Sequence, residues 1–187
     1  MAVARRTQDD WTDAALDVLL NEGPDAVAVQ PIARRLGATK GSFYWHFSSR
    51  DALLRAALAR WEVVATDDVI AEIEASPGSP VEKVKRLFDH VTASSEQHPG
   101  QLLLLGCAGQ PDVTAALERT TTRRIGYVSR LLRDTGLTPA VADLRATLAY
   151  AAYLGHAQLA RTTPAALPRT SRARKELIEE LAAVLLG

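Results

Sequence analysis

The chain has 187 residues, of which 47% are hydrophobic and 24% are charged, as is usual for a globular protein of one or two domains. Its single cysteine excludes an intramolecular disulfide, and its 22 basic and 22 acidic residues give a formal net charge of zero. No apolar segment approaches the roughly 20 residues of a membrane-spanning helix, and no signal-peptide core follows the first arginines, so we expect a cytoplasmic protein with no membrane partner.

The charges are unevenly distributed within the first 50 residues. Residues 9–25 contain six acidic and no basic residues, whereas residues 26–50 contain no acidic residue and four basic ones, Arg34, Arg35, Lys40 and Arg50. Because a local basic segment attracts phosphate even in a neutral chain, the zero net charge does not exclude a nucleic acid as partner.

The first predicted helix begins after Thr7 and ends before Gly23. Thr7 can act as an N-cap, and Asp9 and Asp10 lie in the first turn, where the helix dipole favours negative charge. Apolar residues recur with the spacing of one helical face, at Trp11, Ala14, Ala15, Val18 and Leu19. Gly23 and Pro24 then end the helix.

Two short helices are predicted next, over residues 29–36 and 40–46. Pro31 is tolerated because it lies in the first turn, where its missing N–H has no partner to lose. Gly37 separates the two helices, and Thr39 can cap the second. Two short helices joined by a tight glycine turn are typical of a helix-turn-helix, although many helical proteins contain such a corner.

Apolar residues that follow define the core of this region. Phe43 and Phe47 are four residues apart, and both should point inward. A long fourth helix over residues 50–75, capped by Ser48 or Ser49, should bury a stripe that comprises Leu54, Leu58, Trp61 and Ala65.

The rest of the chain is also predicted to be helical. Residues 76–80 form the clearest linker, because they contain two prolines and a glycine. No later stretch alternates with the period of a strand. We therefore predict an all-α fold of about nine helices, the later ones over residues 81–97, 101–108, 112–134, 139–161 and 171–186.

The segment from Ile32 to Phe47 resembles the DNA-binding stretch of the TetR (tetracycline-repressor-like) family of bacterial transcriptional regulators. The match is gap-free, covers roughly residues 8–55, and includes further residues that fit the same pattern, namely Ala14, Ala15, Gly23, Arg50 and Leu53. Residues 56–187 resemble the family only in the number and length of their helices.

The resemblance implies two domains and a regulatory function. Residues 1–50 would form the helix-turn-helix DNA-binding domain, of three helices and the start of a fourth, and residues 51–187 a helical effector-binding and dimerisation domain. The implied function is a ligand-responsive repressor, which binds a palindromic double-stranded DNA operator as a dimer and is released by a small molecule. Repression rather than activation is not decided by the sequence.

Eight residues are predicted to contact DNA on the basis of this resemblance: Gln30, Thr39, Lys40, Gly41, Ser42, Tyr44, His46 and Arg50. Lys40 can donate to guanine O6 and N7 or to phosphate, and Gly41 lets the backbone approach the duplex. In the family, the positions of Tyr44, His46 and Arg50 usually contact phosphate.

Several of these side chains have a structural alternative. Tyr44 could be a core aromatic, and His46 could instead stabilise the C-terminal end of its helix. The neighbouring Trp45 could be a packing residue or a shallow sugar contact. Arg34 and Arg35 fit a solvated face, with one of them near the DNA backbone.

The sequence departs from the family pattern at Ala28, where a Thr or Ser usually caps the second helix. Loss of such a cap costs about 0.5–2 kcal/mol. Either Pro31 offsets part of this by stiffening the first turn, or Gln30 acts as the cap. Before the first helix, Arg5 and Arg6 could reach the minor groove or simply be a mobile terminus.

The last two predicted helices fit the need for a dimer. The helix over 139–161 is crowded with small residues that permit close helix approach, and the helix over 171–186 adds an apolar face. Paired with their two-fold mates, they would form a four-helix bundle. The alternative is that they only close the core of the monomer.

An effector pocket is implied by the family alone, and its ligand is an unknown small molecule. Residues predicted to line it are large or polar and lie near apolar faces: Trp61, Phe88, Leu104, Cys107, Tyr127, Tyr150, Tyr153 and His156. Each of them could equally be an ordinary core residue.

Two other classes of function lead to different expectations. The four histidines have no metal-ligand spacing, Cys107 has no evident base, and no glycine loop for phosphate is present, so we expect no enzyme, catalytic residue, metal or cofactor. A DNA-bound scaffold controlled by a protein partner would require a large exposed apolar patch and no ligand-sized cavity.

Overall fold

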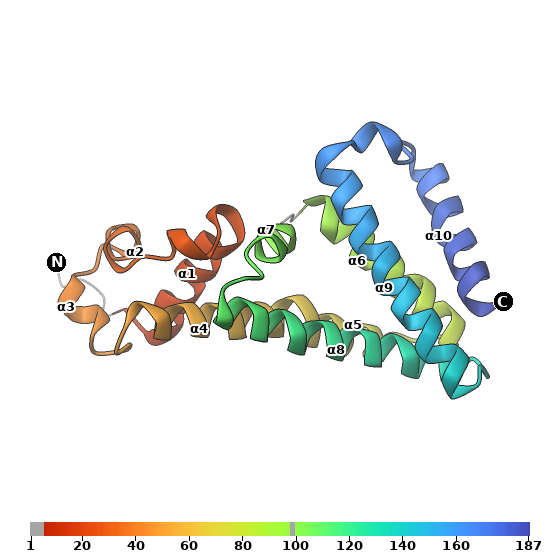
Figure 1. Ribbon diagram of the computed structural model, residues 1–187, viewed down its shortest axis with the longest axis horizontal. Coiled ribbons are helices and arrows are strands. Elements are labelled where there is room, and N and C mark those ends of the chain that lie inside the picture. The colour runs from red at the N-terminus through yellow and green to blue at the C-terminus, as the bar shows by residue number, and fades with distance from the viewer. Residues whose placement is uncertain (1–5, 98–99) are drawn as a thin grey trace. The chain divides into compact units, whose positions relative to one another are not determined.

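The computed structural model describes residues 6–97 and 100–187, and every regular element within them is a helix (Figure 1). The elements in chain order are α1 (Gln8–Glu22), η1 (Pro24–Ala26), α2 (Val29–Leu36), α3 (Lys40–Phe43), α4 (Arg50–Glu62), η2 (Val63–Asp67), α5 (Asp68–Ala75), α6 (Pro80–Gln97), α7 (Gly100–Gly106), α8 (Pro111–Asp134), α9 (Pro139–Thr162), η3 (Pro164–Ala166) and α10 (Ser171–Leu186). The predicted all-α fold is confirmed.

The described residues form two compact units. Unit 1 lies within Met1–Ala65 and Gly100–Glu118, and unit 2 lies within Thr66–Pro99 and Arg119–Gly187. These units differ in extent from the domains predicted at residues 1–50 and 51–187, which concern function rather than compactness. That functional boundary stays a prediction.

Helix α1 begins where its local sequence predicts. The hydroxyl of Thr7 accepts a hydrogen bond from the backbone N–H of Asp10 at 3.1 Å, and the Asp10 carboxylate accepts one from the N–H of Thr7 at 2.7 Å. This reciprocal pair satisfies two donors at the helix start. The backbone N–H of Thr7, together with its hydroxyl, which donates to the same carboxylate at 3.1 Å, holds the pKa of the Asp10 carboxyl below its usual range, because both bonds stabilise the charged form.

Helix α3 is shorter than the predicted 40–46. It ends at Phe43, and the chain continues in a turn in which the N–H of His46 donates to the carbonyl of Phe43 at 2.9 Å, an i→i+3 bond. The N–H of Phe47 donates to the same carbonyl at 3.0 Å. This tightened turn brings Phe47 back into the core four residues after Phe43, so the predicted inward direction of both rings is confirmed.

The predicted helix over 50–75 is continuous but contains a π-helical turn. Helix α4 passes into η2 and then into α5 without a break, so the three form a single helical run. Such wide turns insert an extra residue into a helix and are frequent at functional sites. The run ends at Ser76, whose hydroxyl donates to the carbonyl of Ile73 at 2.6 Å.

Unit 1 has its own apolar core, which α7 and the first half of α8 complete. Its most buried side chains come from α1, α2, α3, α4 and α7, and include Trp11, Leu19, Ile32, Phe43, Leu53, Leu58 and Leu104. Helix α7 packs so closely on α1 that a Cβ at Gly100 would meet the backbone carbonyl oxygen of Leu20 at 2.8 Å. Only glycine fits at that contact.

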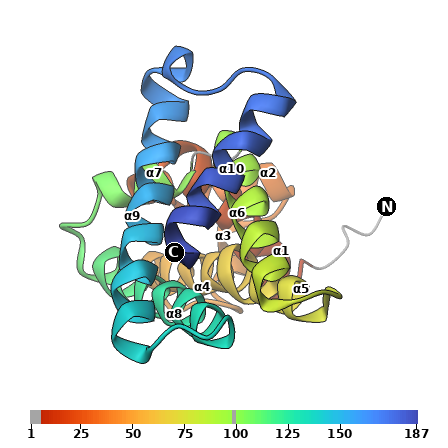
Figure 2. The ribbon, with the colours of Figure 1, turned by 90° about the vertical axis from the view of Figure 1, so that its right-hand side faces the viewer.

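Unit 2 is built around α6, α9 and α10, which lie side by side (Figure 2). Helix α5 and the second half of α8 also contribute to its core. The buried residues of this core include Ile73 of α5, Val84 and Phe88 of α6, Leu131 and Leu132 of α8, Ala142 and Ala146 of α9, and Ile178 of α10. Along the described residues, no helix is both long and apolar enough to cross a membrane.

Helix α2 lacks the side-chain cap that most helices carry. Ala28 has the extended backbone of an N-cap, at φ −133° and ψ 142°, but no side chain bonds from it to the helix. We predict that Ala28→Ser raises the free energy of unfolding by about 0.5 kcal/mol. This gain is at the low end of the range for an N-cap, because Pro31, the third residue of the helix, has no N–H from which the new hydroxyl could accept a hydrogen bond.

Urea denaturation of the variant and the wild type measures this gain. Ala108→Ser, in the exposed turn after α7, is the control and should leave stability unchanged. A loss of stability in Ala28→Ser would contradict the prediction.

Candidate nucleic-acid interface

One end of unit 1 carries α3, whose inner face is anchored by three aromatic rings. Phe43 is fully buried, meets Trp11 edge-on with ring centroids 5.4 Å apart, and stacks on Phe47 at 5.6 Å. The two residues that follow Phe43 are turned outward, since Tyr44 is 55% exposed and Trp45 is 79% exposed. The aromatic core therefore fixes which side of α3 faces solvent.

The leading end of α3 is exposed and well defined. The hydroxyl of Thr39 accepts from the N–H of Ser42 at 3.1 Å, and the Ser42 hydroxyl donates back to the carbonyl of Thr39 at 2.9 Å. Lys40 and Gly41 lie between Thr39 and Ser42 in the chain, and both are exposed to solvent. Of the predicted DNA-binding residues, Thr39 thus has a clear structural role as the cap that holds Lys40 at the helix start.

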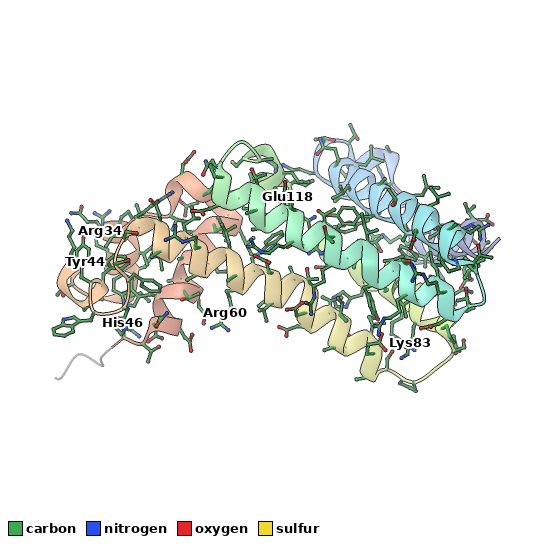
Figure 3. All side chains as sticks on the ribbon, turned by 60° about the horizontal axis from the view of Figure 1, so that its bottom comes forward. Arg34, Tyr44, His46, Arg60, Lys83 and Glu118 are labelled. Atoms are coloured by element: carbon green, nitrogen blue, oxygen red, sulfur yellow. The ribbon has the colours of Figure 1, made fainter. Side chains whose placement is uncertain are left out.

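The other predicted or basic side chains at this end come from α2 and from the turn after α3, and of these Arg34 and Tyr44 are exposed whereas His46 is half-buried. Figure 3 shows Arg34, Tyr44 and His46 at the same end of unit 1, away from Arg60. Gln30 is also exposed, in the first turn of α2, which packs against α3. These positions fit a surface that faces a partner, and their contacts with DNA stay a prediction.

Arg50 is engaged inside the protein. Its Nε donates to the carbonyl of Val27 at 2.8 Å, its guanidinium also reaches the carbonyl of Pro24, and it pairs with Asp51 at 3.2 Å. Arg50 therefore ties the start of α4 to the loop that precedes α2. Its predicted phosphate contact is not tested, but the structure assigns it a second role that spacing did not indicate.

Arg6 also has a structural role. Its Nε donates to the carbonyl of Leu36 at 2.8 Å, which satisfies an end group of α2 next to the left-handed Gly37. Sequence reasoning missed this contact, because it joins residues 30 positions apart. Arg5 lies outside the described residues.

The acidic residues of α1 are partly neutralised within unit 1. Asp17 pairs with Arg35 at 2.6 Å, and Arg60 lies 3.2 Å from Asp9 and 3.1 Å from Asp13. These pairs take up Arg35 and Arg60, so the positive charge at the exposed end of the unit comes from Arg34 and Lys40. Both are exposed to solvent and can therefore attract a polyanion.

The residues predicted to line an effector pocket are divided between the two units. Trp61 and Leu104 are buried in the core of unit 1, and Cys107 packs partly buried against it. The other five lie in unit 2, where Phe88 and Tyr127 are buried in the core and the remaining three are half-buried, namely Tyr150, Tyr153 and His156. A pocket lined by all eight stays a prediction.

This surface and the helical fold define a helix-turn-helix DNA-binding regulator. Residues 12–57 match the family model described as bacterial regulatory proteins, tetR family. The chain is 26% identical over 156 residues to the HTH-type transcriptional regulator SrpR of Pseudomonas putida, which covers 79% of this chain and 70% of that protein. It is 28% identical over 136 residues to AlkX of Mycobacterium tuberculosis, which covers 73% of this chain and 62% of that one.

The fold agrees with solved structures. A TetR-like transcriptional regulator from Rhodococcus sp. RHA1 superposes with a TM-score of 0.70 at 22% identity, over 98% of this chain and 96% of that one. The family model over residues 12–57, the related regulators and the shared fold together support a TetR-family DNA-binding transcriptional regulator. Members of this family are regulators rather than enzymes, and they bind DNA operators as dimers.

Gly41 offers a test of close backbone approach to DNA. The nearest atom to a Cβ at this position would be the Thr39 hydroxyl oxygen at 3.7 Å, an ordinary contact. We predict that Gly41→Ala folds normally, with stability unchanged or raised by up to about 1 kcal/mol, yet binds operator DNA more weakly. Urea denaturation and fluorescence anisotropy with labelled DNA measure the two effects.

Gly126→Ala is the matched control, because Gly126 is an exposed helical glycine of α8 with open space around it. It should retain DNA binding. Equal DNA affinity of the Gly41 variant and the wild type would argue that the α3 backbone does not approach the duplex.

Proposed function

We propose that the protein is a ligand-responsive repressor that binds a palindromic operator as a dimer and is released by a small molecule. The observation that carries the proposal is the exposed leading end of α3, where Lys40 and Gly41 are held outward by the Thr39 cap and the buried Phe43. A helix presented in this way fits the major groove, in which the first residues of a recognition helix read base edges.

Lys40 and Ser42 are the residues proposed to read bases, and Gln30 is proposed to pair with an adenine from the first turn of α2. Tyr44 and His46 are proposed to contact phosphate, and the exposure of Tyr44 supports this assignment over a core position. Trp45 is even more exposed and adds a flat apolar surface at the same end, which supports the sugar contact over internal packing.

The dimer is proposed to form through α9 and α10. The two faces of α9 differ in composition: Ala142, Ala146 and Ala149 are buried in the core of unit 2, whereas Leu144 and Leu148 are 69% and 64% exposed. The exposed apolar stripe of α9 also includes Val141 and Leu159, and α10 carries two exposed apolar residues of its own, Leu177 and Val184. Exposed apolar faces of this kind are stable in water when a second copy covers them.

The small residues of α9 fall into a buried group and an exposed group. Ala146, Ala149 and Ala157 serve the core of unit 2, and Ala151, Ala152 and Gly155 are exposed on the face proposed for the dimer. The latter three permit the close approach of two helices that the dimer requires. The alternative, in which α9 and α10 only close the monomer core, leaves this exposed face without an explanation.

The scaffold alternative has less support. It requires a further exposed apolar patch for a protein partner. Among the described residues, the large exposed hydrophobic side chains outside α9, α10 and the turn after α3 are those of Val63 and Val64. Two valines are a small surface, so small-molecule control is the better proposal.

Release by an effector requires that the effector bind one conformation more tightly than the other. A coupling of about 1–3 kcal/mol would change operator affinity roughly 5- to 150-fold. The helical run α4–η2–α5 begins shortly after α3 in the chain and continues unbroken into the residues of unit 2. This continuity supports a role for the run in the coupling.

Lys40→Ala should weaken operator binding without unfolding the protein. Removal of one phosphate- or base-contacting cation should reduce the slope of log K against log [salt] by about 1 if Lys40 contacts phosphate, and should relax sequence preference if it contacts guanine. Anisotropy titrations at several salt concentrations, with DNA from upstream of the gene, measure both. Lys85→Ala, which removes an ion pair with Glu179 on α10, is the control; unchanged binding by the Lys40 variant would refute the docking.

Leu148→Glu should convert the dimer into a monomer, because the proposed interface would bury two unpaired carboxylates. Sedimentation at micromolar concentration measures the assembly state. Val64→Glu places the same charge on a half-exposed valine outside α9 and α10 and should remain dimeric. A dimeric Leu148 variant would place the interface elsewhere.

A further inference from the structure

A group of polar side chains gathers within unit 2 where η2, α8 and α9 meet. The Nε of Arg124 donates to the hydroxyl of Thr66 at 2.9 Å. One turn earlier on α8, the hydroxyls of Thr121 and Tyr150 are 3.1 Å apart, and the rings of Tyr150 and Tyr153 have centroids 6.0 Å apart. A guanidinium and several hydroxyls therefore lie together inside a helical unit.

The protonation of this group suits it to donate hydrogen bonds. Burial raises the pKa of the Tyr153 hydroxyl, because it disfavours the phenolate, and the positive charge and hydrogen bond of Arg124 offset part of that rise. Tyr153 is therefore a neutral donor at physiological pH, beside a guanidinium that is always charged.

A second observation points to a missing acceptor or donor. Thr120 is 2% exposed, and its hydroxyl has no hydrogen-bond partner among the described residues. It lies four residues before Arg124 and so on the same face of α8. A buried hydroxyl without a partner destabilises the folded protein, and a bound polar group would remove that cost.

Two acids of η2 and α5 pair with cations other than Arg124. Asp67, next to Thr66 in η2, pairs with Arg123 at 2.5 Å, and Glu74 of α5 pairs with Lys83 at 3.2 Å and with Arg130 at 2.5 Å. The bond from Arg124 to Thr66 is one to a neutral hydroxyl. A carboxylate is a stronger acceptor, since charge-assisted hydrogen bonds are about twice as strong as neutral ones.

We propose that Arg124, Tyr150 and Tyr153 bind the acid group of the effector, which is a monocarboxylic acid with an apolar body. The proposal rests on the effector control proposed above and names the chemical class of the ligand. Arg124 binds the carboxylate through its guanidinium, and the tyrosine hydroxyls donate to it. We infer that the apolar body lies against partly buried apolar residues of α5 and α8 that pack on the unit 2 core, such as Val69, Ile70 and Ile125.

The same geometry indicates how binding is transmitted. A carboxylate on Arg124 competes with the hydroxyl of Thr66, which lies in the π-helical turn η2. Release of Thr66 removes a side-chain contact that holds this turn, and η2 is continuous with α4. The acid therefore biases the conformation of the helical run that follows the DNA-binding residues.

The test compares carboxylic acids with their primary amides on the intact protein. The probes are octanoate and octanamide, decanoate and decanamide, benzoate and benzamide, and phenylacetate and phenylacetamide. Calorimetric titration gives affinity, and anisotropy with operator DNA gives release. Acids should bind more tightly than their amides, and the acid that binds best should release DNA.

Arg124→Gln should lower the affinity for acids about 10- to 100-fold, the range for losing a hydrogen bond to a charged group, and should abolish the preference over amides. Tyr153→Phe should reduce that preference by a smaller factor. Arg123→Gln is the matched control, because Arg123 is the adjacent arginine and pairs with Asp67. The Arg123→Gln variant should keep the preference for acids over amides. If Arg124→Gln folds poorly, Arg124→Lys is the alternative test, and because it retains the positive charge it should keep part of that preference.

The outcomes separate this inference from the proposed function. Amides that bind and release DNA as well as the acids do, or an Arg124→Gln variant that still prefers acids, would overturn the acid site and leave effector control standing. Failure of every acid and every amide to bind would also overturn the acid site and leave control by another class of small molecule standing. Failure of the wild type to bind operator DNA would overturn the proposed function itself.

Discussion

The contact between Phe43 and Trp11 is the interaction on which the candidate DNA-binding surface depends. Helix α3 has four residues, far fewer than an isolated helix needs to be stable in water, so its conformation comes from tertiary packing. Burying Phe43 against Trp11 and Phe47 supplies that packing, worth about 1.5–3 kcal/mol for one large side chain. Because the rings occupy the interior, Lys40, Tyr44 and Trp45 are left outside.

Arginine side chains complete this arrangement and explain how a neutral chain presents a basic surface. Arg6 and Arg50 donate to backbone carbonyls at Leu36 and Val27, and Arg35 pairs with Asp17. Each ties two segments of unit 1 together, and Arg6 also satisfies a carbonyl at the C-terminal end of α2. Although the chain has a formal net charge of zero, some of its arginines bond within unit 1, whereas Arg34 and Lys40 remain exposed at the end that carries α3.

In unit 2, the surface proposed for the dimer and the site proposed for the effector lie in different places. The alanine face of α9 packs against neighbouring helices, and the leucine face is exposed and suited to a second copy. Between α8 and α9, the polar group around Arg124 and Tyr153 lies among apolar residues. Its link to Thr66 falls in η2, the wide turn at which one helical run leaves unit 1 and enters unit 2.

Helices whose ends are specified by nearby residues could be predicted from the sequence, whereas the roles of side chains that join distant segments depend on tertiary packing. Residues 29–36 and 171–186 form helices with the predicted bounds, because Gly37 ends the first and Thr170 caps the second within a few residues. The outward position of Lys40 was also predictable, since it follows from the Thr39 cap and the Phe43 spacing. The early end of α3, the internal role of Arg50 and the bond from Arg124 to Thr66 were not, because they depend on packing and on partners up to 58 residues away, which no local pattern records.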